Sequence, residues 1–321
     1  MAEPAVNRRG ILATLVAGVF WICNDACGKL ASEVFPTGEI MAVRGVFAVT
    51  LAVGVVIATG HGRMLWHGAP LFLRPVTLIR ALLDAAVVLT FYKALPYMQL
   101  ANITAISQAT PIIMTLMAAA LGMERIGWRR FLAILVGFSG VVLIIKPSAE
   151  GLTVYAAFAV MSAALVAARD LLTRYIDPVI PSPIIALMTT VAGGLAGLAL
   201  GATEEWRPVV VAPTLYLIMA GILVTLGNLS IVIAYRNAEV GVVAPFRYFG
   251  ILMALPLGYT IFGDLPDTLS ICGIALIMGS GVYTMHRERM RHRLAAASTP
   301  VHIESHLQER PKPGRTAWTM R

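Results

Sequence analysis

Residues 25–36 read DACGKLASEVFP, and residues 170–181 read DLLTRYIDPVIP. In both stretches a basic residue follows an acid by four positions, and a proline comes seven positions later. Other short matches recur in the same order, such as Ser139-Gly140-Val141 and Ser280-Gly281-Val282. Matches that return in order at a nearly fixed offset indicate an internal repeat, here of about 140 residues. The sequence therefore predicts two halves built on one plan.

The composition indicates which solvent surrounds these halves. Of the 321 residues, 58% are hydrophobic and only 13% are charged, with a mean hydropathy of +0.79. Apolar runs of about 20 residues, long enough to cross ~30 Å of hydrocarbon, occur repeatedly. We therefore expect an all-α integral membrane protein with ten transmembrane helices, five in each half. The predicted spans are Ile11–Ala31, Thr37–Ala58, Val76–Leu95, Ala101–Leu121, Trp128–Lys146, Leu152–Leu172, Pro183–Gly201, Leu215–Tyr235, Val240–Phe262 and Thr268–Met285.

An odd number of spans in each half predicts that the second half is inverted relative to the first. The distribution of basic residues agrees, because a cytoplasmic N-terminus leaves only Lys93, Lys146 and Arg207 in outer loops. We expect an inner-membrane protein with both termini in the cytoplasm. The basic residues predicted on the inner side are Arg8, Arg9, Arg63, Arg74, Arg125, Arg129, Arg130, Arg169, Arg174 and Arg236, followed by the arginines of the C-terminal tail.

These boundaries divide the chain into four parts. Residues 1–10 form a cytoplasmic N-terminus, 11–147 the first half, 148–286 the second, inverted half, and 287–321 a basic, disordered cytoplasmic tail. The net charge of +8 resides largely in this tail, which argues against nucleic-acid binding. The tail either contacts anionic lipid headgroups or is a topology anchor with a solvated end.

Several kinds of site are not indicated by the sequence. The six histidines fall in loops or in the tail without neighbouring acids, and the three cysteines form no pairing pattern, so we expect no metal site and no disulfide. A Gly-rich loop ending in Lys-Ser or Lys-Thr is absent from the sequence, so we expect no nucleotide and no other cofactor.

Charged residues within the predicted spans are the main candidates for function. Such charges are costly in a bilayer and normally face the bundle interior. Arg80 and Asp84 lie one helical turn apart, so they either neutralise each other or form a gate or coupling pair. The other charges at predicted membrane depth are Asp25, Arg44 and Arg247.

The repeated acid–base motif places Asp25 and Lys29 near the outer end of the first span and Asp170 and Arg174 near the inner end of the sixth. In one interpretation each pair neutralises itself and complements the helix dipole. In the other, each pair closes one side of a central pathway. A carboxyl group in a desolvated site can titrate near neutral pH, so proton coupling through Asp25 or Asp84 is a further hypothesis.

A candidate binding region surrounds Arg247. The repeat offset places Tyr248 opposite Gln108, in two spans that prolines interrupt. An arginine there could receive a carboxylate or phosphate, or could be satisfied by Asp84 or by backbone carbonyls. The remaining polar residues expected to line this region are Asn24, Tyr92, Ser107 and Asn228.

Several motifs together resemble the EamA type of the drug/metabolite transporter superfamily. They are Trp21 with Asn24-Asp25, Pro36 with Glu39 to Arg44, Phe91 to Leu95, and Gly122-Met123-Glu124-Arg125. The resemblance implies a ten-helix bundle around a central cavity. It also implies transport of small metabolites, as family members move amino acids, riboflavin or S-adenosylmethionine across the inner membrane. Glu39 and Arg44 have no counterparts in the second half, so any role they have is asymmetric.

We therefore expect a secondary active transporter of a small polar or amphipathic metabolite, such as an amino acid, vitamin or nucleoside-like compound. It would work by alternating access and be driven by a gradient. One alternative is an integral-membrane enzyme acting on a lipid-linked substrate, although only isolated acids such as Glu204-Glu205 would serve it. Another is a scaffold subunit, which would place its arginines toward lipid at high cost. One chain could form the whole pathway, as a monomer or within a homodimer.

Overall fold

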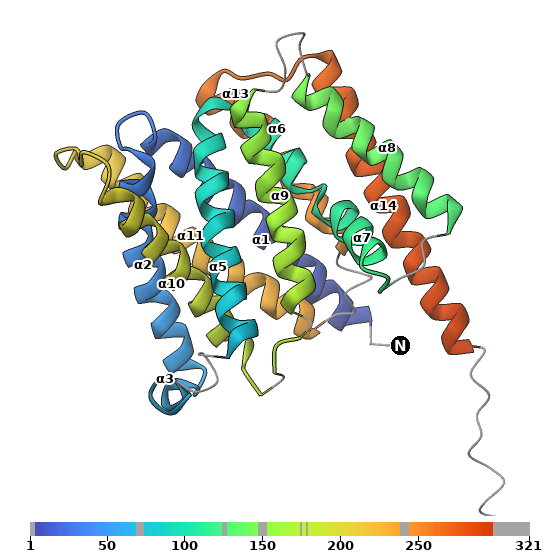
Figure 1. Cartoon of the computed structure of the whole chain (residues 1–321), viewed down its shortest axis with the longest axis horizontal. Coiled ribbons are helices and arrows are strands. Elements are labelled where there is room, and N and C mark those ends of the chain that lie inside the picture. The colour runs from blue at the N-terminus through green and yellow to red at the C-terminus, as the bar shows by residue number, and fades with distance from the viewer. Residues whose placement is uncertain are drawn as a thin grey trace, which may run out of the picture.

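The computed structural model describes residues 4–68, 74–123, 127–146, 153–173, 175–177, 179–237 and 244–297, which form helices and short connections without any strand (Figure 1). The α-helices are α1 (Pro4–Ala31), α2 (Thr37–Ala58), α3 (Gly62–His67), α5 (Pro75–Ala94), α6 (Leu100–Ser107), α7 (Thr110–Ala120), α8 (Trp128–Ile145), α9 (Val154–Thr173), α10 (Ser182–Gly201), α11 (Val211–Asn237), α13 (Phe249–Phe262) and α14 (Thr268–Ala297). Two 3-10 helices, η1 (Leu95–Tyr97) and η2 (Ala244–Tyr248), complete the order.

Eight of the described helical segments are long and apolar enough to cross a membrane. Two shorter apolar helices, Phe131–Ile145 and Phe246–Phe262, lie where the fifth and ninth spans were predicted. Apolar side chains such as Leu82 and Ile57 are largely exposed on the outside of the bundle, where hydrocarbon would cover them. The protein is therefore a multi-pass membrane protein.

Two of the predicted spans are interrupted. The fourth is divided at Gln108 and Ala109 into α6 and α7, and Pro111 occupies the first turn of α7, where its missing N–H removes no helical hydrogen bond. The ninth begins as the 3-10 helix η2 and continues as α13. In contrast, Pro256 lies inside α13 without ending it.

The last helix is longer than predicted. α14 continues beyond Met285 to Ala297, so residues 287–297 of the expected disordered tail are helical. Arginine and alanine are good helix formers, which accounts for the extension. The rest of that tail lies outside the described residues.

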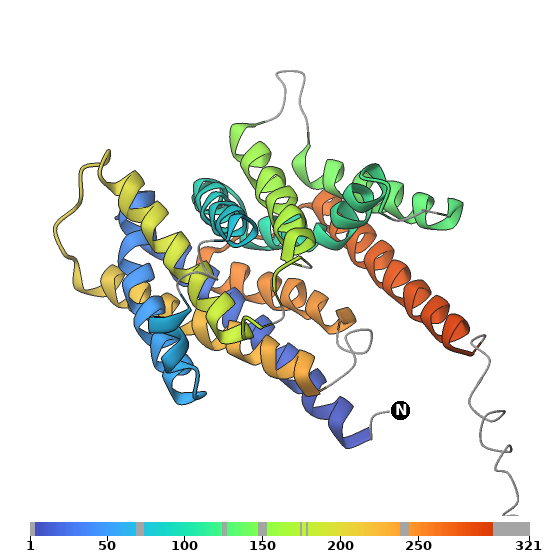
Figure 2. The same cartoon turned by 60° about the horizontal axis from the view of Figure 1, so that its bottom comes forward.

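Each of the main helix contacts joins the first half of the chain to the second. α1 packs chiefly against α11, α2 against α10, α5 against α9, and α8 against α14. The α2–α10 and α8–α14 pairs lie on opposite sides of the molecule, with α1, α5, α9 and α11 between them (Figures 1 and 2).

Small residues allow the α2–α10 pair to approach closely. A Cβ atom added to Gly45 would lie 2.7 Å from the Cα of Gly194, and one added to Gly197 would lie 2.5 Å from the backbone nitrogen of Ala42. Without side chains in the way, the two backbones gain dispersion contacts, the usual basis of close helix packing in membranes. This seam fixes the two helices that form one wall of the central cavity.

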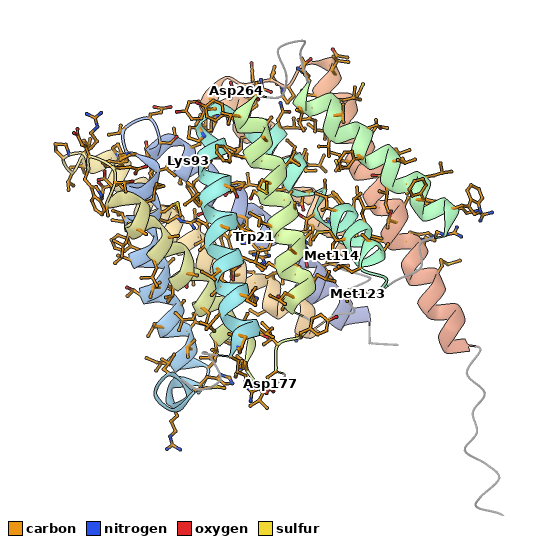
Figure 3. All side chains as sticks on the ribbon, viewed as in Figure 1. Trp21, Lys93, Met114, Met123, Asp177 and Asp264 are labelled. Atoms are coloured by element: carbon orange, nitrogen blue, oxygen red, sulfur yellow. The ribbon has the colours of Figure 1, made fainter. Side chains whose placement is uncertain are left out.

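Charged and aromatic side chains mark the two ends and the middle of the bundle. Figure 3 shows Lys93 and Asp264 toward one end, Asp177 at the other, and Trp21 among the central helices. Polar residues also lie in the middle of the bundle, where they line a cavity.

Candidate functional site

A cavity of about 320 Å³ lies in the centre of the bundle. Helices from both halves line it, including α1, α2 and α5 from the first and α9, α10 and α11 from the second. Small residues such as Gly18, Gly45 and Gly194 leave room for it between the helices. Eight of the residues proposed from the sequence as charged or lining candidates lie in its wall: Asn24, Asp25, Arg44, Tyr92, Ser107, Gln108, Asn228 and Arg247.

One side of the cavity is a chain of polar contacts around Asn24. The amide nitrogen of Asn24 donates to Asp25 Oδ1 at 2.8 Å, and Arg44 Nη1 donates to Asn24 Oδ1 at 2.9 Å. The Arg44 guanidinium also lies 4.9 Å from the centroid of the Tyr92 ring, in a cation–π contact. Asn24 thus links an acid and a base without direct contact between them.

The two interrupted spans meet at the cavity. Gln108, in the break between α6 and α7, donates from Nε2 to the carbonyl oxygen of Arg247 in η2 at 2.7 Å. This contact agrees with the predicted proximity of Gln108 to the Arg247–Tyr248 segment. Tyr248 itself, however, does not line the cavity: its side chain is buried against Gly281 of α14. The expectation that Tyr248 contacts a ligand is therefore not supported by the geometry.

Three buried donor groups at the cavity have no hydrogen-bond partner within the described part of the chain. They are Arg44 Nε, Arg247 Nε and the hydroxyl of Tyr92. Buried polar groups are normally paired, and an unpaired one is costly unless a ligand or water satisfies it. By contrast, Asn228 is satisfied, since it accepts a hydrogen bond from Trp21 Nε1 at 3.2 Å and so joins α1 to α11.

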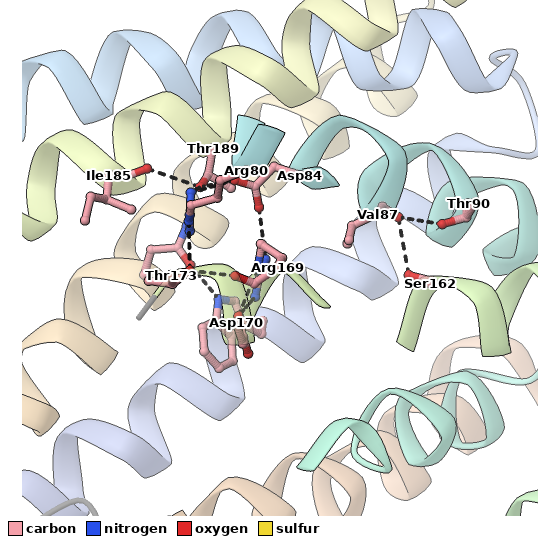
Figure 4. Close-up of polar contacts among 12 residues, drawn as sticks. Arg80, Asp84, Val87, Thr90, Ser162, Arg169, Asp170, Thr173, Ile185 and Thr189 are labelled. Carbon is pink, nitrogen blue, oxygen red and sulfur yellow. Dashed lines mark hydrogen bonds and ion pairs between the residues drawn. The ribbon is translucent and has the colours of Figure 1, made fainter. Parts of the chain in front are cut away.

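A second polar cluster lies beside the cavity, where α5, α9 and α10 meet (Figure 4). Asp84 is fully buried and accepts hydrogen bonds from Arg80 Nη1 at 2.7 Å, Arg169 Nη1 at 3.1 Å and Thr189 Oγ1 at 2.9 Å. Arg169 also holds Asp170, at 2.7 Å. Arg80 and Asp84 thus form the ion pair that their spacing indicates, which fits both roles considered for them. Among the described residues the basic partners of Asp84 are Arg80 and Arg169, not Arg247.

Arg169 is the functional candidate that the sequence analysis missed. It was counted among the cytoplasmic anchors, yet it lies in the last turn of α9, lines the cavity and bridges Asp84 to Asp170. The sequence feature that could have identified Arg169 is its position directly before Asp170, the acid of the repeated motif.

The predicted pairing within that motif is wrong for the first half. Lys29 contacts Asp264 at 3.0 Å and the carbonyl of Met98 at 2.8 Å, not Asp25. Its long side chain extends past the end of α1, where the turn after α13 supplies the carboxylate. In the second half Asp170 pairs with the adjacent Arg169, whereas Arg174 lies outside the described residues.

The described residues hold no group of three or more metal-ligating side chains, and Cys23, Cys27 and Cys272 are free thiols. The polar groups that line the cavity include amide, hydroxyl, carboxylate and guanidinium side chains.

Comparison with known proteins shows which family this chain resembles. The EamA-like transporter family matches residues 8–146. The first part of the chain, residues 8–146, is therefore similar to this family. This agrees with the resemblance to drug/metabolite transporters noted in the sequence.

EamA-like relatives carry the names of transporters. The chain is similar to the pseudopaline exporter of Pseudomonas aeruginosa, with 27% identity over 84% of this chain and 94% of the relative. It is 22% identical to the S-adenosylmethionine uptake transporter of Rickettsia conorii over 87% of this chain and 95% of that one. The riboflavin transporter of Rhizobium johnstonii is 29% identical over 60% of this chain and 64% of its own length. The family match and the names of these relatives point to a membrane transporter rather than an enzyme.

A solved crystal structure shares the fold. It superposes with a TM-score of 0.58 at 17% identity and covers 88% of this chain and 98% of its own. The overall helical arrangement of this EamA-like protein is thus one already seen experimentally.

Proposed function

We propose that this EamA-like protein is a secondary active transporter that moves a small polar or amphipathic metabolite across the inner membrane by alternating access. The observation that carries the proposal is the central cavity, which both halves line and at which two interrupted helices meet. Transporters commonly place their substrate sites at such breaks, because the freed backbone groups can bind a ligand.

The pattern of helix contacts supports inverted halves. If α1 corresponds to α9 and α5 to α11, exchanging the halves converts the α1–α11 contact into the α5–α9 contact. The same exchange maps α2–α10 and α8–α14 onto themselves. A bundle with this internal twofold symmetry can adopt two related packings, each opening the cavity to one side.

An ion pair and a hydrogen bond at one end of the bundle are suited to a gate. Lys29 of α1 binds Asp264 of the second half at 3.0 Å, and the Glu204 carboxylate accepts from the backbone N–H of Gly38 at 2.7 Å. Both contacts cross between the halves. We propose that they close the outer end of the pathway, with both termini in the cytoplasm, and that they break when the cavity opens outward.

Asp25 is the proposed site of proton coupling. It lines the cavity, and no basic nitrogen among the described residues lies within the 4.0 Å ion-pair limit of its carboxylate. Asp84, in contrast, is already held by the guanidinium groups of Arg80 and Arg169. The geometry therefore supports proton coupling through Asp25 rather than through Asp84.

The substrate panel follows from the relatives and the cavity. It contains riboflavin and S-adenosylmethionine, because relatives are named for them, together with amino acids, polyamines and nucleosides. A single chain surrounds the cavity, so a monomer is sufficient for the proposed pathway.

The test measures thermal unfolding of the purified protein with each compound, followed by uptake into proteoliposomes. A compound that binds only the folded state adds about 2.7 kcal/mol at a hundred times its Kd. We expect at least one compound to raise the unfolding temperature, with the shift removed by Arg247→Ala and retained by Arg74→Ala, whose side chain is exposed and pairs with Asp177. A lack of both stabilisation and uptake across the panel would contradict the proposal.

A further inference from the structure

The cavity contains two arginines with unused hydrogen-bonding capacity. Arg44 donates a hydrogen bond from Nη1 to Asn24, while its Nε is buried without a partner among the described residues. Arg247 also has a buried Nε without a partner among the described residues, and neither arginine forms an ion pair within that part of the chain. The third arginine of the cavity, Arg169, is already neutralised by Asp84 and Asp170.

These two arginines come from opposite halves of the chain. Arg44 lies in α2 and reaches α1 at Asn24. Arg247 lies in η2, where its carbonyl oxygen accepts a hydrogen bond from Gln108. The two side chains therefore enter the cavity from different elements, one in each half.

We infer that the substrate carries two oxyanionic groups, one bound by Arg44 and the other by Arg247. A guanidinium binds a carboxylate or a phosphate through two parallel N–H donors, and the unpaired Nε atoms supply one donor of each pair. The Tyr92 hydroxyl, buried without a partner beside Arg44, adds a third donor next to that guanidinium.

The charge balance of the cavity agrees with such a substrate. With Arg169 neutralised, the lining holds two unpaired cations against a single acid, Asp25. A net positive site inside a bilayer is costly without counter-charge, so an anion is favoured over a cation, and the two unpaired arginines offer one contact for each charged group of a dianion. This inference rests on the proposed transport function and narrows it to one class of substrate.

The experiment uses the purified full chain and measures binding and proteoliposome counterflow of linear dicarboxylates from succinate to sebacate. Monocarboxylates of matched length and ω-phosphate analogues form the other arms, and these distinguish carboxylate from phosphate ends. We expect the best dicarboxylate or phosphocarboxylate to bind about ten- to a hundredfold more tightly than its monoanionic match, as the loss of one charged hydrogen-bonded contact predicts.

Lysine variants separate the two contacts. Arg44→Lys and Arg247→Lys retain the positive charge but lose the planar fork, so each should reduce dianion affinity to near that of the monoanion. Arg74→Lys, outside the cavity, is the matched control and should leave the affinities unchanged. Unfolding temperatures of the variants confirm that each is folded.

The outcomes distinguish this inference from the proposed function. Equal affinity for monoanions and dianions, or counterflow of an uncharged compound that both lysine variants leave unchanged, overturns the two-anion inference and leaves the transporter proposal standing. Failure of every compound, including the broader metabolite panel, to bind or exchange overturns both.

Discussion

Replacing Gly197 by alanine tests the close packing of α10 on α2. The new Cβ would lie 2.5 Å from the nitrogen of Ala42 and 2.6 Å from the Cβ of Met41. Carbon atoms in good contact lie about 3.5–4.0 Å from their neighbours, so the two helices would have to separate by about 1 Å. Because the obstacle is backbone, no change of rotamer can relieve it.

Gly54 provides the matched control. It lies inside α2, where an added Cβ would meet nothing within 4 Å. Both substitutions gain the same helix propensity, about 1 kcal/mol, so their difference isolates the steric cost. Overpacking of this kind typically costs about 1–3 kcal/mol. Gly54→Ala should therefore be neutral or stabilising, and Gly197→Ala should be less stable than Gly54→Ala by that amount.

The assay is thermal unfolding of both variants in the same detergent and at the same scan rate, since membrane proteins commonly unfold irreversibly. At about 2–4 °C per kcal/mol for domains somewhat smaller than this chain, the unfolding temperatures should differ by several degrees. Equal unfolding temperatures, or a more stable Gly197→Ala, would refute the close approach of the two backbones.

Four further predictions concern the charged groups. Asp84→Asn leaves the buried Arg80 guanidinium without its anion and should destabilise the protein by about 3–5 kcal/mol, whereas Asp170→Asn, at a more exposed site, should cost less. Similar unfolding temperatures would contradict the role given to Asp84. Asp25→Asn should abolish uptake driven by a pH gradient but preserve counterflow, and full gradient-driven uptake by this variant would exclude Asp25 as the coupling group. Lys29→Asp and Asp264→Lys should each impair transport, while the double exchange should restore it; no recovery in the double variant would argue against a simple ionic gate. The hydrogen bond from Lys146 lowers the pKa of Asp267 from 3.8 to about 2, so the stability contributed by this carboxylate is present above pH 3.8 and is lost as the pH falls toward 2. The unfolding temperatures of wild type and Asp267→Asn should therefore converge over that range. A constant difference between the two temperatures would refute the assignment.

Features that depend on local sequence were predictable. The limits of α2 follow from Pro36, which precedes the helix, and from the apolar run that ends at Ala58. The interruption of the fourth span follows from Pro111, and the pairing of Arg80 with Asp84 follows from their spacing of one helical turn. In each case the physical cause lies within a few residues of its effect.

Features that depend on distant partners were not predictable. Lys29 binds an acid 235 positions away in preference to the one on its own helix face. The orientation of Tyr248 toward Gly281 depends on how α14 crosses η2, which no local pattern encodes. The partners of Arg169 likewise become apparent only when α5 and α9 are packed together.

The contacts between halves also affect how the protein is made. Each long helix of the first half has its main neighbour in the second half, so the helices of the first half can enter the membrane but cannot complete their packing when they leave the ribosome. The contact between Asp84 and Arg169 cannot form until Arg169 is synthesised, 85 residues later. During that interval the unfinished half exposes its polar surface to other proteins of the insertion machinery. Either half should therefore be degraded when a cell produces it alone, and both should be protected when one cell produces the two halves as separate chains.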